Sequence, residues 1–262
     1  MADSNVRLDD PLGEALRLID QAEGRRIQLR LMGGLAFHAR VPAWTARLDR
    51  EGRDIDLATR GRDRKAVSDL LTEAGYRPDR QYNALYGHKQ LYFVDPDRAR
   101  PVDVLVDQLE MCHRFEFADR LAVDNQTLPL AELLLSKLQV VKVNRKDVLD
   151  ALILLVEHPL GGGDGDTINV PRIVGLTSND WGWWRTVTGN LEKLKAFAST
   201  ELKPADLDRG GRPPRFDAVG QIVELRGAID AAPKSTRWKL RARVGDRMPW
   251  YEEPEEVGHG RG

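Results

Sequence analysis

Two aspartates, Asp54 and Asp56, stand two residues apart between apolar neighbours, and this pattern constrains the fold more than any other in the chain. Side chains two residues apart on a β-strand point to the same face. In an extended segment the two carboxylates would therefore converge, while Ile55 and Leu57 pack on the opposite face. Like charges this close raise each other's pKa, and a divalent cation relieves the repulsion. Oxygen-rich sites of this kind suit Mg²⁺ or Mn²⁺.

A glycine pair, Gly33-Gly34, lies upstream and ends an alternating segment, residues 27–32, that is typical of a β-strand. Glycine backbone lets a phosphate group approach closely. A Gly-Gly turn alone, or an Asp-x-Asp strand edge alone, is common in proteins without such a role. The order of glycine pair, helix-like segment at 35–39 and acid pair predicts a site for a metal ion and a phosphate group.

A third carboxylate lies inside the apolar segment 101–106, which also reads as a strand. Asp103 stands there among Val and Leu, and burying a charge without a partner is costly. A metal shared with Asp54 and Asp56 would supply the partner, whereas an exposed strand edge is the alternative. Asp107 is the second candidate on the same strand face. At roughly 3.3 Å per residue it would lie about 13 Å from Asp103, too far to share the metal.

A lysine interrupts the apolar stripe of a predicted helix at 130–141. On a helical wheel Lys137 falls in the middle of that stripe, so its ammonium must either reach solvent or meet an anion. One interpretation is a point charge that contacts the phosphates of a nucleotide. The other is an ordinary surface lysine. Asp147, downstream, could orient Lys137 or could stabilise the first turn of the next helix.

The remaining pattern predicts an α/β (α+β) protein, with a small mixed sheet in residues 1–128 and a mainly helical region at 129–262. Strands are expected at 27–32, 54–58, 90–94 and 101–106. Helices are expected at 11–23, 64–74, 130–141, 145–157, 181–198 and 221–229, the fifth of them capped by Asp180. Residues 159–166 and 203–216 are expected to form loops. The tryptophans at 181–184 are expected to pack in the core.

A basic stretch at 233–247 carries six basic residues and one acid, with Trp238 among them. Such a stretch can follow a phosphate backbone and stack a base, or it can be a solvated surface with Trp238 as a packing anchor. The net charge of the whole chain is −1, so any basic surface is local.

Composition points to a cytoplasmic protein with no membrane partner. The N-terminus lacks the features of a signal peptide, and no apolar run approaches the ~20 residues that span a bilayer. A single cysteine, Cys112, excludes an internal disulfide and favours a reducing compartment. No Cys-x-x-Cys spacing exists, which argues against a zinc site.

Gly33-Gly34, the segment 53–57 and the later strand aspartate together resemble the nucleotidyltransferase fold of the DNA polymerase β superfamily. More narrowly, the segments 33–38, 136–138 and 145–150 are similar to those of AbiEii-like nucleotidyltransferases, which include toxins of type IV toxin–antitoxin systems. The resemblance covers roughly residues 15–157. One departure is the long separation of the glycine pair from the acid pair, which predicts an enlarged, substrate-selecting loop at 42–47.

The resemblance implies a catalytic nucleotidyltransferase core at 1–128, followed by the helical region. Asp54, Asp56 and Asp103 would be the catalytic residues and would hold Mg²⁺ or Mn²⁺, while Gly33, Gly34 and Lys137 would bind the NTP substrate. A nucleoside monophosphate would pass to an acceptor hydroxyl. RNA is the first candidate acceptor and a cognate antitoxin the candidate protein partner. The alternatives are a small-molecule, antibiotic-type nucleotidyltransferase and a catalytically silent nucleotide-binding module.

Overall fold

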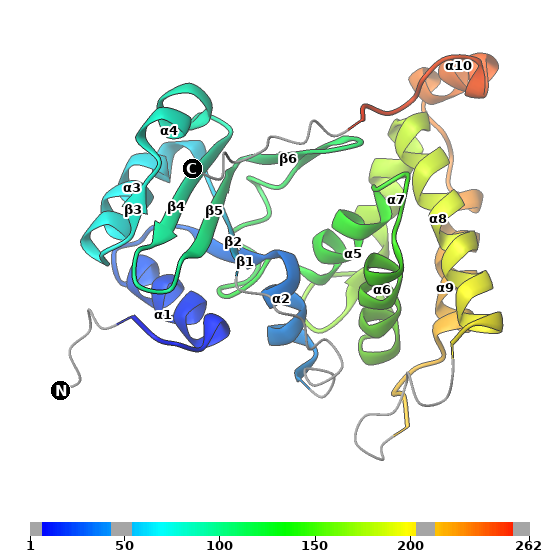
Figure 1. The fold of residues 1–262 in the computed structure, drawn as a ribbon. Coiled ribbons are helices and arrows are strands. Elements are labelled where there is room, and N and C mark those ends of the chain that lie inside the picture. The colour runs from blue at the N-terminus through cyan, green and yellow to red at the C-terminus, as the bar shows by residue number, and fades with distance from the viewer. Residues whose placement is uncertain (1–6, 43–53, 203–212, 254–262) are drawn as a thin grey trace.

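The computed structural model of the protein describes residues 7–42, 54–202 and 213–253 (Figure 1). Most of the enlarged loop predicted at 42–47 and of the loop predicted at 203–216 lies outside the described residues. The predicted α/β region followed by a mainly helical region is confirmed. Figure 1 shows the sheet and its helices beside the bundle of later helices.

A five-stranded mixed sheet forms the first region, in the order β1-β2-β5-β4-β3. The strands are β1 (Leu29–Met32), β2 (Ile55–Thr59), β3 (Arg77–Pro78), β4 (Gln90–Asp95) and β5 (Arg100–Val106). Strands β2 and β5 pair in parallel, and the other neighbours are antiparallel. The parallel pair places the predicted acidic strands side by side at the centre of the sheet.

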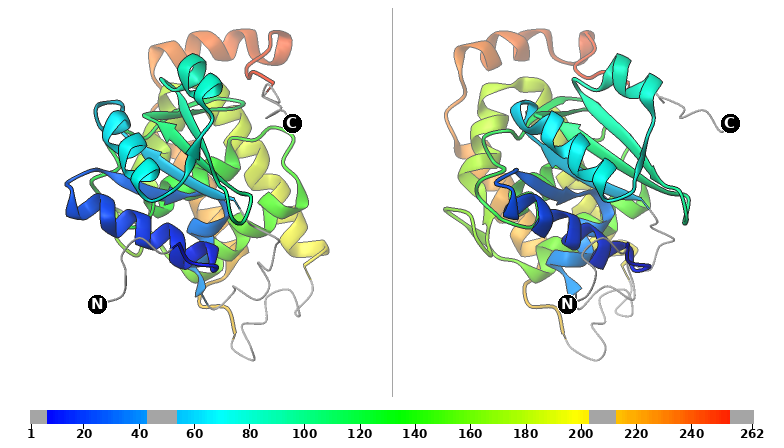
Figure 2. Two further views of the ribbon diagram at one scale, coloured as in Figure 1. Left: turned by 60° about the vertical axis from the view of Figure 1, so that its left-hand side comes forward. Right: turned by 90° about the vertical axis from the view of Figure 1, so that its left-hand side faces the viewer.

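The two faces of the sheet differ because residues alternate in burial along β4 and β5. Apolar residues such as Phe93 and Val104 are fully buried in the core. Helices α1 (Pro11–Gly24) and α3 (Arg64–Glu73) contribute their apolar faces to the same core, and Figure 2 shows them covering the sheet. Gln90, Tyr92 and Asp103 point to the other face and stay partly exposed. The short helix α4 (Arg80–Tyr86) leads into β4.

The second region consists of helices α5 (Leu130–Leu138), α6 (Arg145–Glu157), α7 (Val170–Asn179), α8 (Trp181–Thr200), α9 (Ala218–Ala231) and α10 (Thr236–Val244). The Asp180 carboxylate accepts a hydrogen bond from the Trp183 N–H at 3.0 Å, which confirms the predicted cap of α8. Helix α5 ends earlier than predicted. Asn190 stabilises this end, because its amide donates to the oxygen of Leu138, the last residue of α5, and to that of Val140 just beyond it, at 2.8 Å each.

Five segments depart from the predictions. Helices α7 and α10 were not predicted, and neither was α4. Residues 159–166 were predicted to form a loop only, but β8 (Leu160–Gly161) pairs with β9 (Ile168–Asn169) across that turn. A hairpin of β6 (Gln108–Glu110) and β7 (Arg114–Glu116) follows β5. In the part of the chain that the structure describes, no helix is long and apolar enough to cross a membrane.

The two regions share one continuous hydrophobic core. Helix α2 (Gly33–Arg40) contacts the sheet as well as α5 and α6, and its Phe37 is buried between them. The segment before α5 follows the free edge of β1, because the Leu31 N–H donates to the Gln126 carbonyl and the Leu128 N–H donates to the Leu31 carbonyl. A boundary at residues 128–129 stays a prediction.

Candidate active site

The centre of the sheet brings two of the predicted carboxylates together. In the parallel pairing of β2 with β5, Asp56 stands directly opposite Asp103. Asp54 immediately precedes β2. Burial, together with the negative charges of Asp103 and Asp54, raises the pKa of Asp56 to about 7. The negative charges of Asp54 and Asp103 therefore both influence Asp56, on the face of the sheet that stays partly exposed.

This crowding of negative charge fits a divalent cation, which would stabilise the ionised form of Asp56. The positive charges of Lys137 and Lys146 lower the pKa of Asp56. They offset the negative charges only in part, because the pKa still lies well above its usual value. As the side chains stand, no three acidic, histidine or cysteine residues of the described chain converge closely enough to hold a metal ion. The metal thus remains a prediction that rests on the chemistry of the three carboxylates.

Gln90 holds the carboxylate of Asp103, a contact that the sequence analysis missed. Its side-chain amide donates to the Oδ1 of Asp103, and its own oxygen accepts a hydrogen bond from the Tyr82 hydroxyl at 3.1 Å. Tyr92 stands opposite Asp103 in the β4–β5 register. The alternation of β4 carries the signal, since it places Gln90 and Tyr92 on the same face.

Three tyrosines form an aromatic surface beside the carboxylates. The ring centroid of Tyr82 lies 5.0 Å from that of Tyr86 and 6.2 Å from that of Tyr92. Tyr86 is 46% exposed, so part of this surface faces solvent. Burial and the charge of Asp103 raise the pKa values of Tyr82 and Tyr92. Both hydroxyls therefore stay neutral and able to donate hydrogen bonds.

The glycine pair forms the turn from β1 into α2, and its two residues do different things. Gly33 has φ +63°, and a Cβ there would lie 1.9 Å from the Oδ2 of Asp56. Only glycine fits at this position. A Cβ on Gly34 would meet no atom of the described chain within 4 Å. Met32, at the N-cap of α2, carries a thioether rather than a capping oxygen, so the first N–H groups of α2 suit a phosphate.

Lys137 is held by two carboxylates of α6. Its Nζ lies 2.8 Å from the Oδ1 of Asp147 and 3.0 Å from the Oδ2 of Asp150, and 5.4 Å from the ring centroid of Phe37. Burial lowers the pKa of Lys137, but the two carboxylates outweigh it and raise the pKa above the usual value. Both roles predicted for Asp147 agree with its position, because its carboxylate contacts Lys137 and it is the acidic residue in the first turn of α6. Phosphate binding by Lys137 stays a prediction.

Asp107, the second candidate for the third carboxylate, lies elsewhere. It follows the end of β5 with φ +62° and is therefore not on the strand face of Asp103 as predicted. Its Oδ1 accepts a hydrogen bond from the Gly61 N–H at 2.9 Å. The left-handed turn directs the carboxylate to the loop after β2, where it caps the 3₁₀ turn Gly61–Asp63.

The tryptophans pack as predicted. Trp181 and Trp183 are buried, and the Trp183 ring centroid lies 5.6 Å from that of Phe115. Trp238 from the basic stretch packs edge-on against Trp184, with 5.2 Å between centroids. The basic stretch itself forms α10, so Trp238 anchors that helix on the bundle.

The mixed sheet carries Asp56 on β2, Asp54 just before it, Asp103 on the parallel neighbour and a glycine turn into α2, an arrangement that agrees with the resemblance to nucleotidyltransferases. Residues 14–95 match the family model of aminoglycoside-2''-adenylyltransferase. The match contains Gly33, Gly34, Asp54 and Asp56 and ends before Asp103. No curated protein and no solved structure matches the chain. The narrower resemblance to AbiEii-like proteins stays a prediction.

Proposed function

We propose that the protein transfers a nucleoside monophosphate from an NTP to an acceptor hydroxyl and releases pyrophosphate. The observation that carries this proposal is the pairing of Asp56 with Asp103 beside the Gly33 turn. The family match favours ATP as the donor. Asp54, Asp56 and Asp103 would hold Mg²⁺ or Mn²⁺. The bound ion would neutralise charge that develops on the triphosphate.

The protein's own groups would position the reactants. Backbone N–H groups at the start of α2 would donate to phosphate oxygens, and Gly34 leaves room for them to approach. Lys137 would add a positive charge. Asp103 would accept the proton of the acceptor hydroxyl. Gln90 supports this role because its amide fixes the orientation of the Asp103 carboxylate.

A small cationic acceptor fits the surroundings best. Asp79 adds its charge to that of Asp103 near Tyr82, and Asp147 and Asp150 already offset Lys137. Among the residues that the structure describes, carboxylates therefore outnumber cations around the site. Tyrosine faces attract cations as well. The matched family is named for aminoglycosides, whose amino groups are cationic, so an amino-sugar acceptor agrees with both observations.

The test is transfer of label from α-phosphate-labelled ATP with Mg²⁺, using an aminoglycoside panel, total RNA or no acceptor. We expect a labelled aminoglycoside with the wild type and none with Asp56→Asn. Asp69→Asn, on the exposed side of α3, is the matched control and should retain transfer. Absence of transfer by the wild type to every acceptor would contradict the proposal. Equal transfer by Asp56→Asn would contradict the site.

RNA is the second candidate acceptor, favoured by the basic helix α10. It corresponds to the toxin-like role with a cognate antitoxin. Growth arrest on expression that disappears with Asp54→Ala, together with labelled RNA, would select this reading over the amino sugar. Thermal stabilisation by NTP and Mg²⁺ without any turnover would indicate a silent nucleotide-binding module instead.

A further inference from the structure

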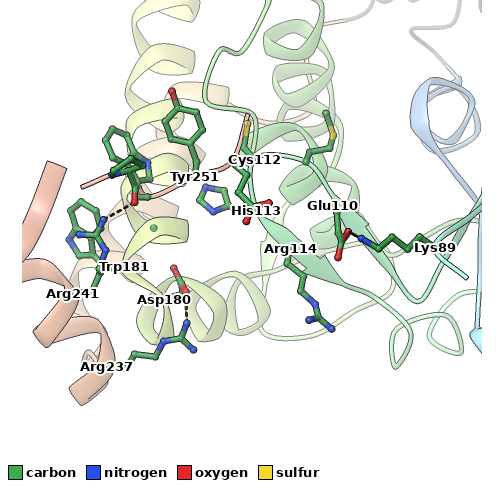
Figure 3. Close-up of a pocket in the computed structure, with 15 residues that line it drawn as sticks. Lys89, Glu110, Cys112, His113, Arg114, Asp180, Trp181, Arg237, Arg241 and Tyr251 are labelled. Carbon is green, nitrogen blue, oxygen red and sulfur yellow. Dashed lines mark hydrogen bonds and ion pairs between the residues drawn. The ribbon is translucent and has the colours of Figure 1, made fainter. Parts of the chain in front are cut away.

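A cavity of about 900 Å³ lies apart from the carboxylates, and neither Asp56 nor Asp103 lines it. Five segments line it: Lys89 before β4, the β6–β7 hairpin, the start of α8, helix α10 and residues 249–252. Figure 3 shows Trp181 and Arg241 on one side of the cavity, Lys89 and Glu110 on the other, and His113 between them. The volume falls within the range of small-molecule sites, roughly 300–1,000 Å³.

Aromatic side chains form its walls and are fixed in place. The guanidinium of Arg241 lies 4.6 Å from the ring centroid of Trp181, and Trp250 meets Trp181 edge-on at 6.2 Å. The Trp250 Nε1 donates to the Oγ1 of Thr186 at 3.1 Å. Gly182 permits this packing, because a Cβ there would lie 2.7 Å from the Trp250 carbonyl oxygen. Trp181 is itself buried and has Arg241 over its ring, so the rings that a flat ligand could reach are those of the half-buried Trp250 and Tyr251.

The acidic side chains that line the cavity are already paired, so positively charged side chains remain available at its rim. Glu110 pairs with Lys89, and Asp180 is engaged in capping α8 and lies 3.5 Å from Arg237. The side chain of Arg237 is 83% exposed, and Arg114 pairs only with an equally exposed glutamate within the described chain. A ligand with negative charge can therefore reach both guanidinium groups at little cost.

Positive charge lies on both faces of α10, because Arg237 and Arg241 line the cavity and side chains two residues further on point away from it. Lys239 and Arg243 are four residues apart on this helix and share one face. Both are exposed, as is Arg247, and among the described residues none of the three forms an ion pair. Cations on both faces of α10 fit a chain of phosphates that passes around the helix better than they fit a single anionic group. The aromatic walls fit a base better than the side chains of an acidic protein.

We propose that the cavity and the outer face of α10 bind single-stranded nucleic acid. A base would stack on the aromatic walls beside Tyr251, and the flanking phosphates would contact Arg237, Lys239 and Arg243. This site is distinct from the carboxylate site and does not depend on nucleotidyl transfer. The purified protein can therefore be tested for binding without NTP and without metal ions. The result of this binding test is separable from the result of the transfer assay.

The test is the fluorescence anisotropy of a labelled oligouridine of about a dozen nucleotides, titrated with the protein in EDTA. We expect saturable binding whose affinity falls as salt rises between about 50 and 200 mM. Three phosphate contacts predict a slope of about −2 in a plot of log K against log salt. Tyr251→Ala should weaken binding roughly 5- to 150-fold through the loss of one stacking surface.

Two matched controls make the result specific. Lys239→Glu with Arg243→Glu should abolish most of the salt dependence, whereas Lys65→Glu with Lys195→Glu, which changes the net charge equally, should not. Tyr86→Ala removes an exposed tyrosine beside the carboxylates and should leave oligouridine binding intact. Circular dichroism confirms that each variant is folded.

Several outcomes would overturn the proposal. They are no binding by the wild type, equal effects of the two double variants, and a loss of binding in Tyr86→Ala but not in Tyr251→Ala. Displacement of the oligonucleotide by UMP at equal concentration would indicate a mononucleotide site instead. Equal displacement by polyglutamate would indicate an acidic protein partner.

Discussion

The raised pKa of Asp56 predicts that the metal-free protein loses stability as the pH rises. The carboxyl group ionises near pH 3.8 in the unfolded chain and near pH 7 in the folded protein. Between these values the folded protein keeps a proton that the unfolded chain has released. The free energy of unfolding therefore decreases as the pH rises through this window, and the loss is complete above about pH 7.

The size of the effect follows from the two pKa values. Each pH unit inside the window changes the free energy of unfolding by about 1.4 kcal/mol. Across the whole window, Asp56 lowers the stability by about 4 kcal/mol. Between about pH 5.5 and pH 8 the change is about 2 kcal/mol, because ionisation in the folded protein is nearly complete above pH 7.

The measurement is urea unfolding of wild type and Asp56→Asn in EDTA at these two pH values. The neutral amide of the variant cannot ionise. It serves as the baseline that removes the contribution of His113, whose pKa burial lowers to about 4, and of His158, whose pKa burial also lowers. We expect the wild type to lose about 2 kcal/mol more than the variant on going to alkaline pH.

Adding Mg²⁺ at alkaline pH should restore stability to the wild type much more than to Asp56→Asn, since binding to the folded state alone stabilises it. A wild type that responds to pH in the same way as the variant would refute the argument that the three carboxylates crowd one another. Stabilisation of both proteins by Mg²⁺ to the same extent would place the cation elsewhere.

Three further substitutions test the site. Gly33→Ala should destabilise the protein by at least about 2 kcal/mol in urea unfolding, since it strains the backbone and displaces the Asp56 carboxylate. Gly34→Ala should unfold like the wild type but bind NTP more weakly in calorimetry, and unchanged NTP affinity would argue against a phosphate there. Lys137→Met should cost about 3–5 kcal/mol, because Asp150, whose side chain is 1% exposed, loses its cation; a cost below about 1 kcal/mol would refute a buried ion pair.

Much of the fold could be predicted because its strands alternate and its helices have clear ends. Asp103 was identifiable because a carboxylate inside an apolar strand needs a partner. Its pairing with Asp56 was not, since the register of two strands separated by two α-helices and two other strands depends on tertiary packing. The role of Gln90 could not be read from its own segment, because its contact with Asp103 depends on the pairing of β4 with β5.

Helix α10 and the cavity beside it escaped prediction for different reasons. The helix lacks an apolar stripe, and it is held by the Ser235 cap and by Trp238 against Trp184. The cavity draws its walls from several segments that are spread over residues 89–252. Periodicity describes one element at a time, so a site assembled from several of them remains invisible to it.

The close contact of Gly33 with Asp56 has a consequence for how ligands would bind. The turn that would meet a phosphate and the carboxylate that would meet a cation occupy adjoining space, so neither can shift without the other. A nucleotide that orders the turn also orders the carboxylate. The two affinities should then be linked, with each ligand raising the affinity for the other by the same factor. The absence of a side chain at position 33 would thus make the binding of a cation and of a nucleotide cooperative.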